Sequence, residues 1–243
     1  MTWAVLIATA VLIGWFIVVA CFAAKESAAA RDIEAQEVTV ERSQDYPISW
    51  MRPFPKSTRD FLPAFLRNRP DKVFSDANRL TNMEPLRQLK GLRILQLCGD
   101  QIVSLSTFAS HRGIVKLYLH DTLVTDLRPL QNMTDLHVID IVDSPVSDIS
   151  TLAQLPNISR IFLIGTQTNN IQCLRNTVSL REITLQDTKV TDLSPLHQLP
   201  LLESVKLSMS TNRSAVEALR AALPNCKIIV TDEQLYHRVP IEN

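Results

Sequence analysis

Glycine is scarce in this chain, with 5 residues in 243, and no glycine-rich loop of the kind that cradles phosphates occurs. The zinc-site patterns H-E-x-x-H and C-x-x-C are missing as well. Net charge is also absent, because 25 basic residues balance 25 acidic ones. Proteins that bind nucleic acid usually carry a basic patch. We therefore expect no nucleic-acid partner, no metal, no cofactor and no catalytic residue, and we expect that the chain is not an enzyme.

Cysteines are few and scattered. Cys98, Cys173 and Cys226 show no pairing pattern, and a fourth cysteine, Cys21, lies in an apolar stretch. A disulfide framework needs paired cysteines in an oxidising compartment. The sequence therefore favours a reducing compartment for most of the chain.

What the chain has in abundance is one apolar pattern, L-x-x-L-x-L, which returns six times at intervals of 22 residues. Its copies are Leu92/Leu95/Leu97, Ile114/Leu117/Leu119, Leu136/Ile139/Ile141, Ile158/Ile161/Leu163, Leu180/Ile183/Leu185 and Leu202/Val205/Leu207. One such unit cannot bury its apolar residues alone, whereas stacked units close a continuous core. Alternation within x-L-x-L-x has the period of a strand, so equivalent strands are expected to form one parallel sheet.

These residues resemble the leucine-rich-repeat family, and the 22-residue spacing resembles its internalin-like bacterial subclass. The resemblance implies an α/β solenoid with a parallel β-sheet on the concave face and short 3-10-like turns on the convex face. It implies little about function, because the ligand of a repeat scaffold depends on the variable positions.

Two polar columns accompany the frame. One comprises Asp100, Thr122, Ser144, Thr166, Thr188 and Ser210, which can bond to nearby backbone where the chain leaves each strand. The other comprises Asn82, Ser104, Asp126, Asp148, Asn170 and Asp192, all of them residue types that cap helices. Catalytic carboxylates are the alternative for the second column, but a periodic recurrence favours capping of one turn per repeat.

Residues 3–24 contain no charged residue. A helix of this length can cross a hydrocarbon core of ~30 Å at ~1.5 Å per residue, so we expect a single-pass transmembrane helix at the N-terminus. Val18-Val19-Ala20-Cys21 resembles a lipobox, which leaves lipidation at Cys21 as an alternative; a cleaved signal peptide is a third. Lys25 and Arg31 follow the apolar run and favour a cytoplasmic repeat domain by the positive-inside rule.

The remaining segments divide the chain further. We expect a linker at 25–45, an aromatic and proline-rich N-terminal cap at 46–71, repeats at 72–210, a C-terminal cap at 211–230 and a tail at 231–243. Ser57-Thr58-Arg59-Asp60 and Ser214 to Glu217 have the pattern of capping boxes that open a helix in each cap.

Function should reside on the outward strand positions, where side chains of different repeats meet. The apolar ones are Ile94, Tyr118, Val138, Val142, Phe162 and Ile164. An exposed apolar cluster of this kind marks a protein-interaction site, unless the N-terminal cap or the linker covers it. The sequence thus predicts a membrane-anchored module that binds an unidentified protein partner. A structural or self-assembling envelope component is the alternative.

A catalytic use of the same face is the weakest interpretation. Cys98 and His120 should be neighbours across two strands, with Asp140 diagonal to His120. A nucleophile also needs a cleft and an oxyanion site, and the repeat pattern predicts neither.

Overall fold

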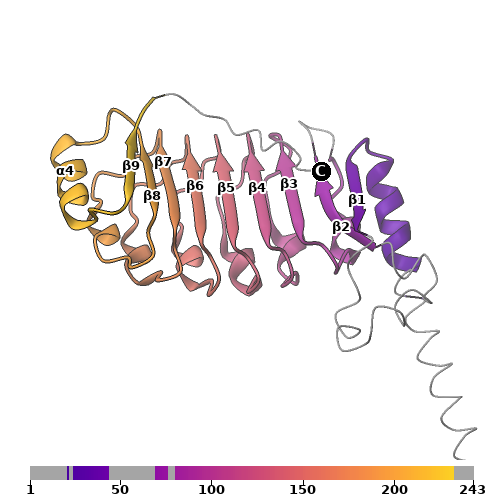
Figure 1. Cartoon of the computed structure of the whole chain (residues 1–243). Coiled ribbons are helices and arrows are strands. Elements are labelled where there is room, and N and C mark those ends of the chain that lie inside the picture. Colours follow the sequence, from indigo (N-terminus) through magenta and orange to yellow (C-terminus); the bar gives the residue numbers. More distant parts are fainter. Residues whose placement is uncertain (1–20, 22–23, 44–68, 76–79, 233–243) are drawn as a thin grey trace, which may run out of the picture.

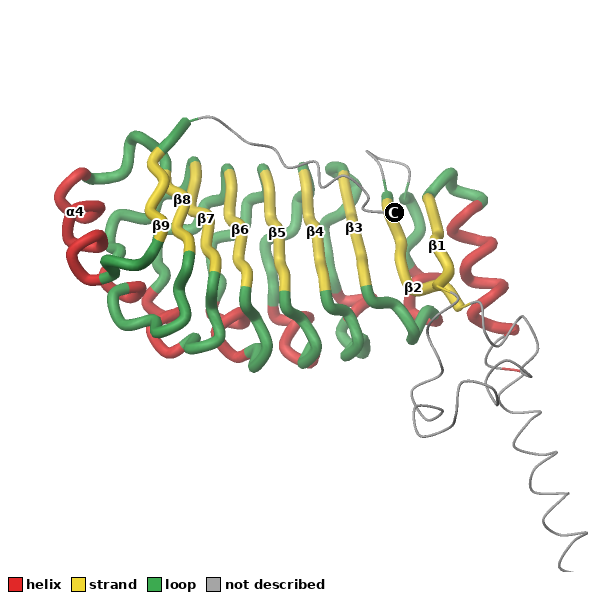
Figure 2. Tube along the Cα trace, in the orientation of Figure 1, coloured by secondary structure: helices red, strands yellow, loops and turns green. Residues whose placement is uncertain are grey.

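The structure is a computed structural model, and it describes residues 21, 24–43, 69–75 and 80–232. These form an elongated array in which the strands stand side by side (Figures 1 and 2). Nine described strands build one sheet in the order β1 to β9, antiparallel between β1 and β2 and parallel from β2 onward. The strands are β1 Thr39–Ser43, β2 Arg69–Phe74, β3 Ile94–Cys98, β4 Lys116–His120, β5 Val138–Val142, β6 Arg160–Ile164, β7 Glu182–Gln186, β8 Ser204–Leu207 and β9 Lys227–Val230.

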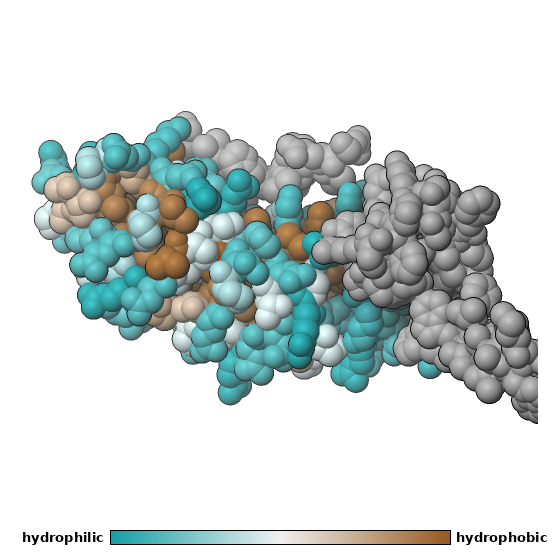
Figure 3. All heavy atoms as spheres, turned by 60° about the horizontal axis from the view of Figure 1, so that its bottom comes forward, coloured by the Kyte–Doolittle hydropathy of each residue, from teal (hydrophilic) through white to brown (hydrophobic). Residues whose placement is uncertain are grey.

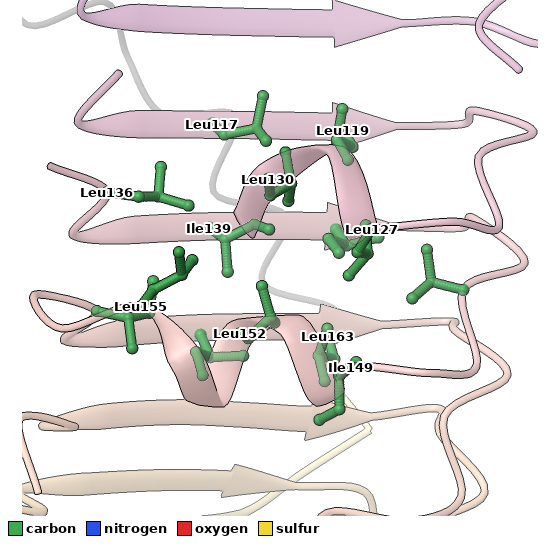
Figure 4. Close-up of a cluster of buried hydrophobic side chains, with 14 of the residues drawn as sticks. Leu117, Leu119, Leu127, Leu130, Leu136, Ile139, Ile149, Leu152, Leu155 and Leu163 are labelled. Atoms are coloured by element: carbon green, nitrogen blue, oxygen red, sulfur yellow. The ribbon is translucent and has the colours of Figure 1, made fainter. Parts of the chain in front are cut away.

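A short 3-10 turn follows each strand from β2 to β7, as the 22-residue frame predicts. The turns are η2 Glu84–Gln88, η3 Ser106–Phe108, η4 Arg128–Asn132, η5 Ser150–Gln154, η6 Gln172–Asn176 and η7 Ser194–Leu196. Leu and Ile side chains of the strands and turns meet in the space between the two layers (Figure 4). Ile139 and Leu152, for example, are fully buried there. The predicted repeat core is therefore confirmed.

The second polar column binds the backbone at the start of every one of these turns. In each repeat the side-chain oxygen accepts a hydrogen bond from the N–H two residues further on, as Asp148 does from Ser150 at 2.8 Å and Asn170 from Gln172 at 2.8 Å. Asn82, Ser104, Asp126 and Asp192 make the same contact. The N-cap of each turn is the next residue along, so the column lies one position before the place that we predicted, but its hydrogen bonds to the backbone account for the periodic carboxylates without chemistry.

A third column escaped the sequence analysis. The residue directly after each of β3 to β7 has a positive φ, and these residues are Gly99, Asp121, Asp143, Gly165 and Asp187. Glycine adopts this left-handed conformation freely, and Asp is among the side chains that tolerate it best. At Gly165, with φ +62°, an added Cβ would lie 2.0 Å from Oδ1 of Asp143, so any other residue would have to displace this carboxylate as well as adopt the left-handed conformation.

The N-terminal end differs from our expectation of a linker at 25–45. Residues 24–34 are helical and bury Ala29, Ala30 and Ile33 in the core, and β1 then pairs with β2. The side chain of Gln36 joins this unit to the first repeat, because its Oε1 accepts hydrogen bonds from the backbone N–H groups of Thr81 and Asn82 at 3.0 and 2.8 Å. This segment covers the end of the array, since an uncovered end would expose the core.

At the other end, helix α4 (Arg213–Ala222) and β9 cover the last repeat (Figure 1). Our capping box at Ser214 to Glu217 was misplaced. Asn212 is the N-cap, and its Oδ1 accepts from the N–H of Ser214 at 2.9 Å, while Glu217 pairs with Arg213. Asn is as good an N-cap as Ser, and it stands two residues earlier.

Several expectations lie outside the described residues. They are nearly all of the apolar run 3–24, most of the aromatic cap at 46–71 and its capping box at 57–60, and all but two residues of the tail 231–243. Among the helices of the described part, none combines the length and apolar character needed to span a membrane.

Candidate binding surface

We use the name strand face for the side of the sheet that points away from the core. Three rows of side chains make it up, and the observed register aligns them as the 22-residue period predicts. The rows are Ile94/Lys116/Val138/Arg160/Glu182/Ser204 where the strands begin, Gln96/Tyr118/Asp140/Phe162/Thr184/Lys206 in the middle, and Cys98/His120/Val142/Ile164/Gln186 where the strands end.

The apolar residues of this face are less exposed than we expected. Tyr118, Val138, Val142 and Ile164 retain 7%, 9%, 5% and 8% of their accessible surface. Ile94 and Phe162 are half-buried. None of the four buried residues belongs to the repeat core, because they lie on the opposite side of the sheet. The face therefore carries apolar residues of its own, but only part of them is open to solvent.

On β6 and β7 exposure falls from the start of the strand to its end, whereas on β5 both Val138 and Val142 are buried. In the first row Arg160 is exposed, and Lys116 and Glu182 are half-buried. In the last row Val142, Ile164 and Gln186 are all buried. Figure 3 brings forward the side on which the strands begin, and hydrophilic side chains cover most of the described surface there. On β6 and β7 the open part of the strand face is thus the charged edge where these strands begin.

Arg160 and Glu182 on the open edge are paired with each other, and Lys206 of the middle row also lies near Glu182. Glu182 lies between Arg160 and Lys206, with N–O distances of 3.9 and 3.8 Å. Ion pairs of this exposure contribute ~1 kcal/mol or less to stability, so they are free to exchange partners on binding.

One charged pair lies among the apolar side chains. Nε2 of His120 is 3.5 Å from Oδ2 of Asp140, and the His120 ring packs edge-on against Tyr118 at 6.2 Å between centroids. Burial alone would lower the pKa of His120, but the contacts with Asp140 and Cys98 outweigh it and raise the pKa to about 9. The 3.5 Å contact lacks the angle of a hydrogen bond, so we attribute the effect of Asp140 mainly to its charge. His120 is then a cation at neutral pH.

This arrangement bears directly on the catalytic interpretation. Cys98 and His120 are neighbours in register, as expected, and Asp140 is diagonal to His120. With its pKa raised to about 9, His120 is protonated at neutral pH and cannot take a proton from a thiol, so the trio lacks a base at that pH. Within the described ranges, no three His, Cys, Asp or Glu side chains are grouped so as to hold a metal ion.

The surface formed by the 3-10 turns, which we call the turn side, has separate hollows and no continuous face. One of about 360 Å³ is lined by Asp148, Asn170 and Cys173, and another of about 490 Å³ by Asn170 and Asp192. The polar side chains in them already bind backbone, and the N–H of Ser150 lowers the pKa of Asp148. These hollows are therefore by-products of capping, and the strand face remains the stronger candidate surface.

No family model and no curated protein matches the sequence. Solved structures do match it. An internalin (InlF) of Listeria monocytogenes superposes with a TM-score of 0.55 at 19% identity over 72% of this chain, and the chain spans only 53% of that protein. Internalin C2 of the same organism gives a TM-score of 0.57 at 22% identity, covering 79% of this chain and 99% of that one.

A leucine-rich-repeat protein of Leptospira interrogans also matches, with a TM-score of 0.51 at 15% identity over 60% of this chain and 44% of that one. Identities this low establish the fold and leave the ligand open. The strand register, the turn in each repeat and these neighbours together show that the chain has the leucine-rich-repeat fold of the internalin-like kind.

Proposed function

We propose that this protein is a membrane-anchored module that binds a protein partner through the strand face. One observation carries the proposal: side chains of successive repeats form an apolar and aromatic cluster on the side of the sheet that the core does not use. Core positions are fixed by stacking and turn positions by capping, so the strand face is the part of each repeat that can be adapted to a ligand. The structural neighbours are repeat proteins of the same fold, which is consistent with a binding role. The proposal includes no catalytic step.

Phe162 is the residue of this cluster on which we centre binding. It is the largest apolar side chain of the face that remains half-exposed, and Asp140 and Thr184 flank it in the neighbouring strands. Interface energy usually concentrates in a few such anchors, each worth ~2 kcal/mol or more on truncation. Arg160 and Glu182 provide a charged rim beside it.

The anchor in this proposal is the uncharged run at 3–24. The repeat domain would then lie directly at the membrane, because helical residues 24–34 already pack into the core and leave no linker. Lys25 and Arg31 are exposed, and by the positive-inside rule they favour a cytoplasmic repeat domain. The protein should stay in the membrane fraction after an alkaline wash, with its N-terminus unprocessed. A mature N-terminus at an acylated Cys21 would mean that the anchor is a lipid and not a transmembrane helix.

Capture of the partner tests the binding surface. The full chain is isolated from the cell that makes it as wild type, as Phe162→Asp and as Val178→Asp, a control on the turn side with 61% exposure. We expect a stoichiometric partner that Phe162→Asp loses and Val178→Asp keeps. The opposite pattern, or loss only on changing Arg128 and Gln131 of η4, would refute the strand face. If the wild type retains only copies of itself, the alternative of a self-assembling envelope component holds.

A further inference from the structure

The side of the array on which the strands begin, which we call the strand-start side, is basic over β3 and β4. The segments 89–94 and 111–116 lead into these two strands, and neither contains an acidic residue. Their four basic residues, which we call the basic edge, are Lys90, Arg93, Arg112 and Lys116. The sequence shows no block of like charge there, because stacking of the repeats brings together residues that are far apart along the chain.

Three of these four side chains have no acidic partner. Lys90 and Arg112 are exposed, and Lys116 is half-exposed. Arg93 pairs with Asp135 at 3.5 Å, but in the part of the chain that the structure describes no carboxylate forms an ion pair with the other three. The basic edge therefore keeps an excess of positive charge.

The segments that lead into β7 and β8 differ in this respect. Arg181 pairs with Glu203 there, and Glu182 lies between Arg160 and Lys206. The excess of positive charge thus lies over β3 and β4, toward the N-terminal end of the array. A patch of one sign attracts ligands or surfaces of the opposite sign.

The chain also enters the array on the strand-start side. Gln36, just after helical residues 24–34, binds Thr81 and Asn82 beyond the end of β2, so the helix ends on the opposite side, where the strands end. Figure 1 shows this helix alongside β1. Its length of ~15 Å, at ~1.5 Å per residue, is close to that of a strand of five residues. The helix therefore begins on the strand-start side, and β4 is only three strands from β1, or ~14 Å at ~4.8 Å per strand.

We propose that the basic edge contacts the anionic headgroups of the membrane that holds the anchor. This inference rests on the proposed function, because the uncharged run 3–24 ends where the helix begins. Basic side chains next to a membrane are attracted to anionic lipid, and each one near the surface strengthens the contact roughly 5-fold. Lipid is the anionic surface that the anchor itself brings within reach, so we favour it over a nucleic acid or an acidic protein.

Contact at the basic edge determines how the strand face is presented. The strands rise from the membrane, and their ends point away from it. Arg160 and Glu182 pair with each other, so β6 and β7 lack this attraction to lipid. Phe162 in the middle of β6 then stays clear of the headgroups, and lipid contact and partner binding use separate parts of the array.

Amine labelling of the full chain in lipid nanodiscs tests the contact. Discs of phosphatidylcholine alone are compared with discs of equal parts phosphatidylcholine and phosphatidylglycerol. Labelling rates of Lys90 and Lys116 are followed by peptide mass mapping. Lys189, which is exposed beyond the end of β7, is the control within the same protein.

A pair of double substitutions completes the design, with Lys116 as the labelled residue in both. Lys90→Gln plus Arg112→Gln removes two charges from the basic edge. Arg175→Gln plus Lys189→Gln is the matched control, because it removes two exposed charges that lie elsewhere on the array.

We expect Lys90 and Lys116 to react ~5-fold or more slowly in the anionic discs than in the neutral ones, because contact with headgroups shields their amines. Lys189 should react at the same rate in both. Salt at about 1 M shortens the Debye length to ~3 Å and should remove the protection. The substitutions in the basic edge should abolish most of the protection of Lys116, and the control substitutions should leave it unchanged.

Equal rates in the two kinds of disc would overturn the inference. Equal protection in neutral discs would also overturn it, since it would assign the contact to something other than anionic lipid. So would equal protection of Lys189, or protection that appears only when a nucleic acid is added. A chain that fails to enter neutral discs would refute the anchor, whereas the difference between the two kinds of disc reports the basic edge, so the two proposals fail separately.

Discussion

His111→Leu should stabilise the protein. His111 stands where the frame places Leu89, Met133 and Leu155 in other repeats, and like them it is buried, with 2% of its surface exposed. Its Nε2 lies 3.2 Å from the carbonyl oxygen of Leu86, and its Nδ1 has no hydrogen-bond partner in the described part of the chain. The Leu86 oxygen also accepts from the N–H of Leu89 at 3.0 Å, so it would keep a partner after the substitution.

The magnitude follows from these contacts. Leucine removes a buried unsatisfied nitrogen that costs ~1–3 kcal/mol and gives up one hydrogen bond worth ~1 kcal/mol, for a net gain of about 1 kcal/mol near pH 7.5. Burial, together with the charge of Lys90, lowers the pKa of His111 below its usual value of 6.5. Below pH 6.5 the unfolded chain therefore binds a proton that the folded protein refuses, and the wild type loses stability as pH falls. The advantage of His111→Leu should grow by about 1 kcal/mol between pH 7.5 and 5.5, within the ~1.4 kcal/mol per pH unit that one group can supply.

Urea unfolding of the full chain, followed by circular dichroism at both pH values, measures this difference. The exposed His137 gives a matched control, and His137→Leu should leave the midpoint nearly unchanged at pH 7.5. A variant at His111 that is less stable than wild type at pH 7.5, or an advantage that does not grow at pH 5.5, would refute the reasoning.

Three further predictions concern the core, the strand ends and the charged pair. Ile139→Ala, at a fully buried position, should cost ~2–5 kcal/mol of unfolding free energy in urea, and a loss below 1 kcal/mol would mean that the site is not packed as described. Gly165→Ala should cost ~2 kcal/mol or more of unfolding free energy, because it combines a left-handed backbone with a collision against Asp143. Gly113→Ala is the control, since its new methyl would meet nothing closer than 3.7 Å, and it should cost less than half as much. Equal losses of unfolding free energy would contradict the backbone geometry. The pKa of His120 is raised to about 9, so the stability that its charge contributes should be complete below pH 6.5 and lost as pH rises through 9. Over that range the thermal midpoint of the wild type should fall relative to the midpoint of His120→Gln. Midpoints that change equally with pH in both proteins would contradict the pairing with Asp140.

The repeats could be predicted from the sequence because the same constraint acts in every copy. A 22-residue period forces equivalent residues into register, and the observed pairing of Tyr118 with Asp140 and of Asp140 with Phe162 follows from it. The capping column was equally predictable, since a side chain such as Asp148 needs only the backbone two residues away. The left-handed column was within reach too, because Gly99 and Gly165 hold equivalent positions in two repeats.

The ends of the array carry no such repetition. Pairing of β1 with β2 joins residues about 30 positions apart, and the small residues Ala29 and Ala30 gave no apolar pattern strong enough to predict burial. Exposure of the strand face could not be predicted for the same reason. An expectation drawn from the repeats alone leaves Val142 open to solvent, whereas only 5% of its surface is exposed.

The most direct test of the account is photo-crosslinking from the strand face. A photoreactive amino acid replaces Phe162 or, as a control, Val178 in the full chain. The account predicts one crosslinked protein from position 162 and none from position 178. Crosslinks that arise from position 178 and not from position 162 would contradict it.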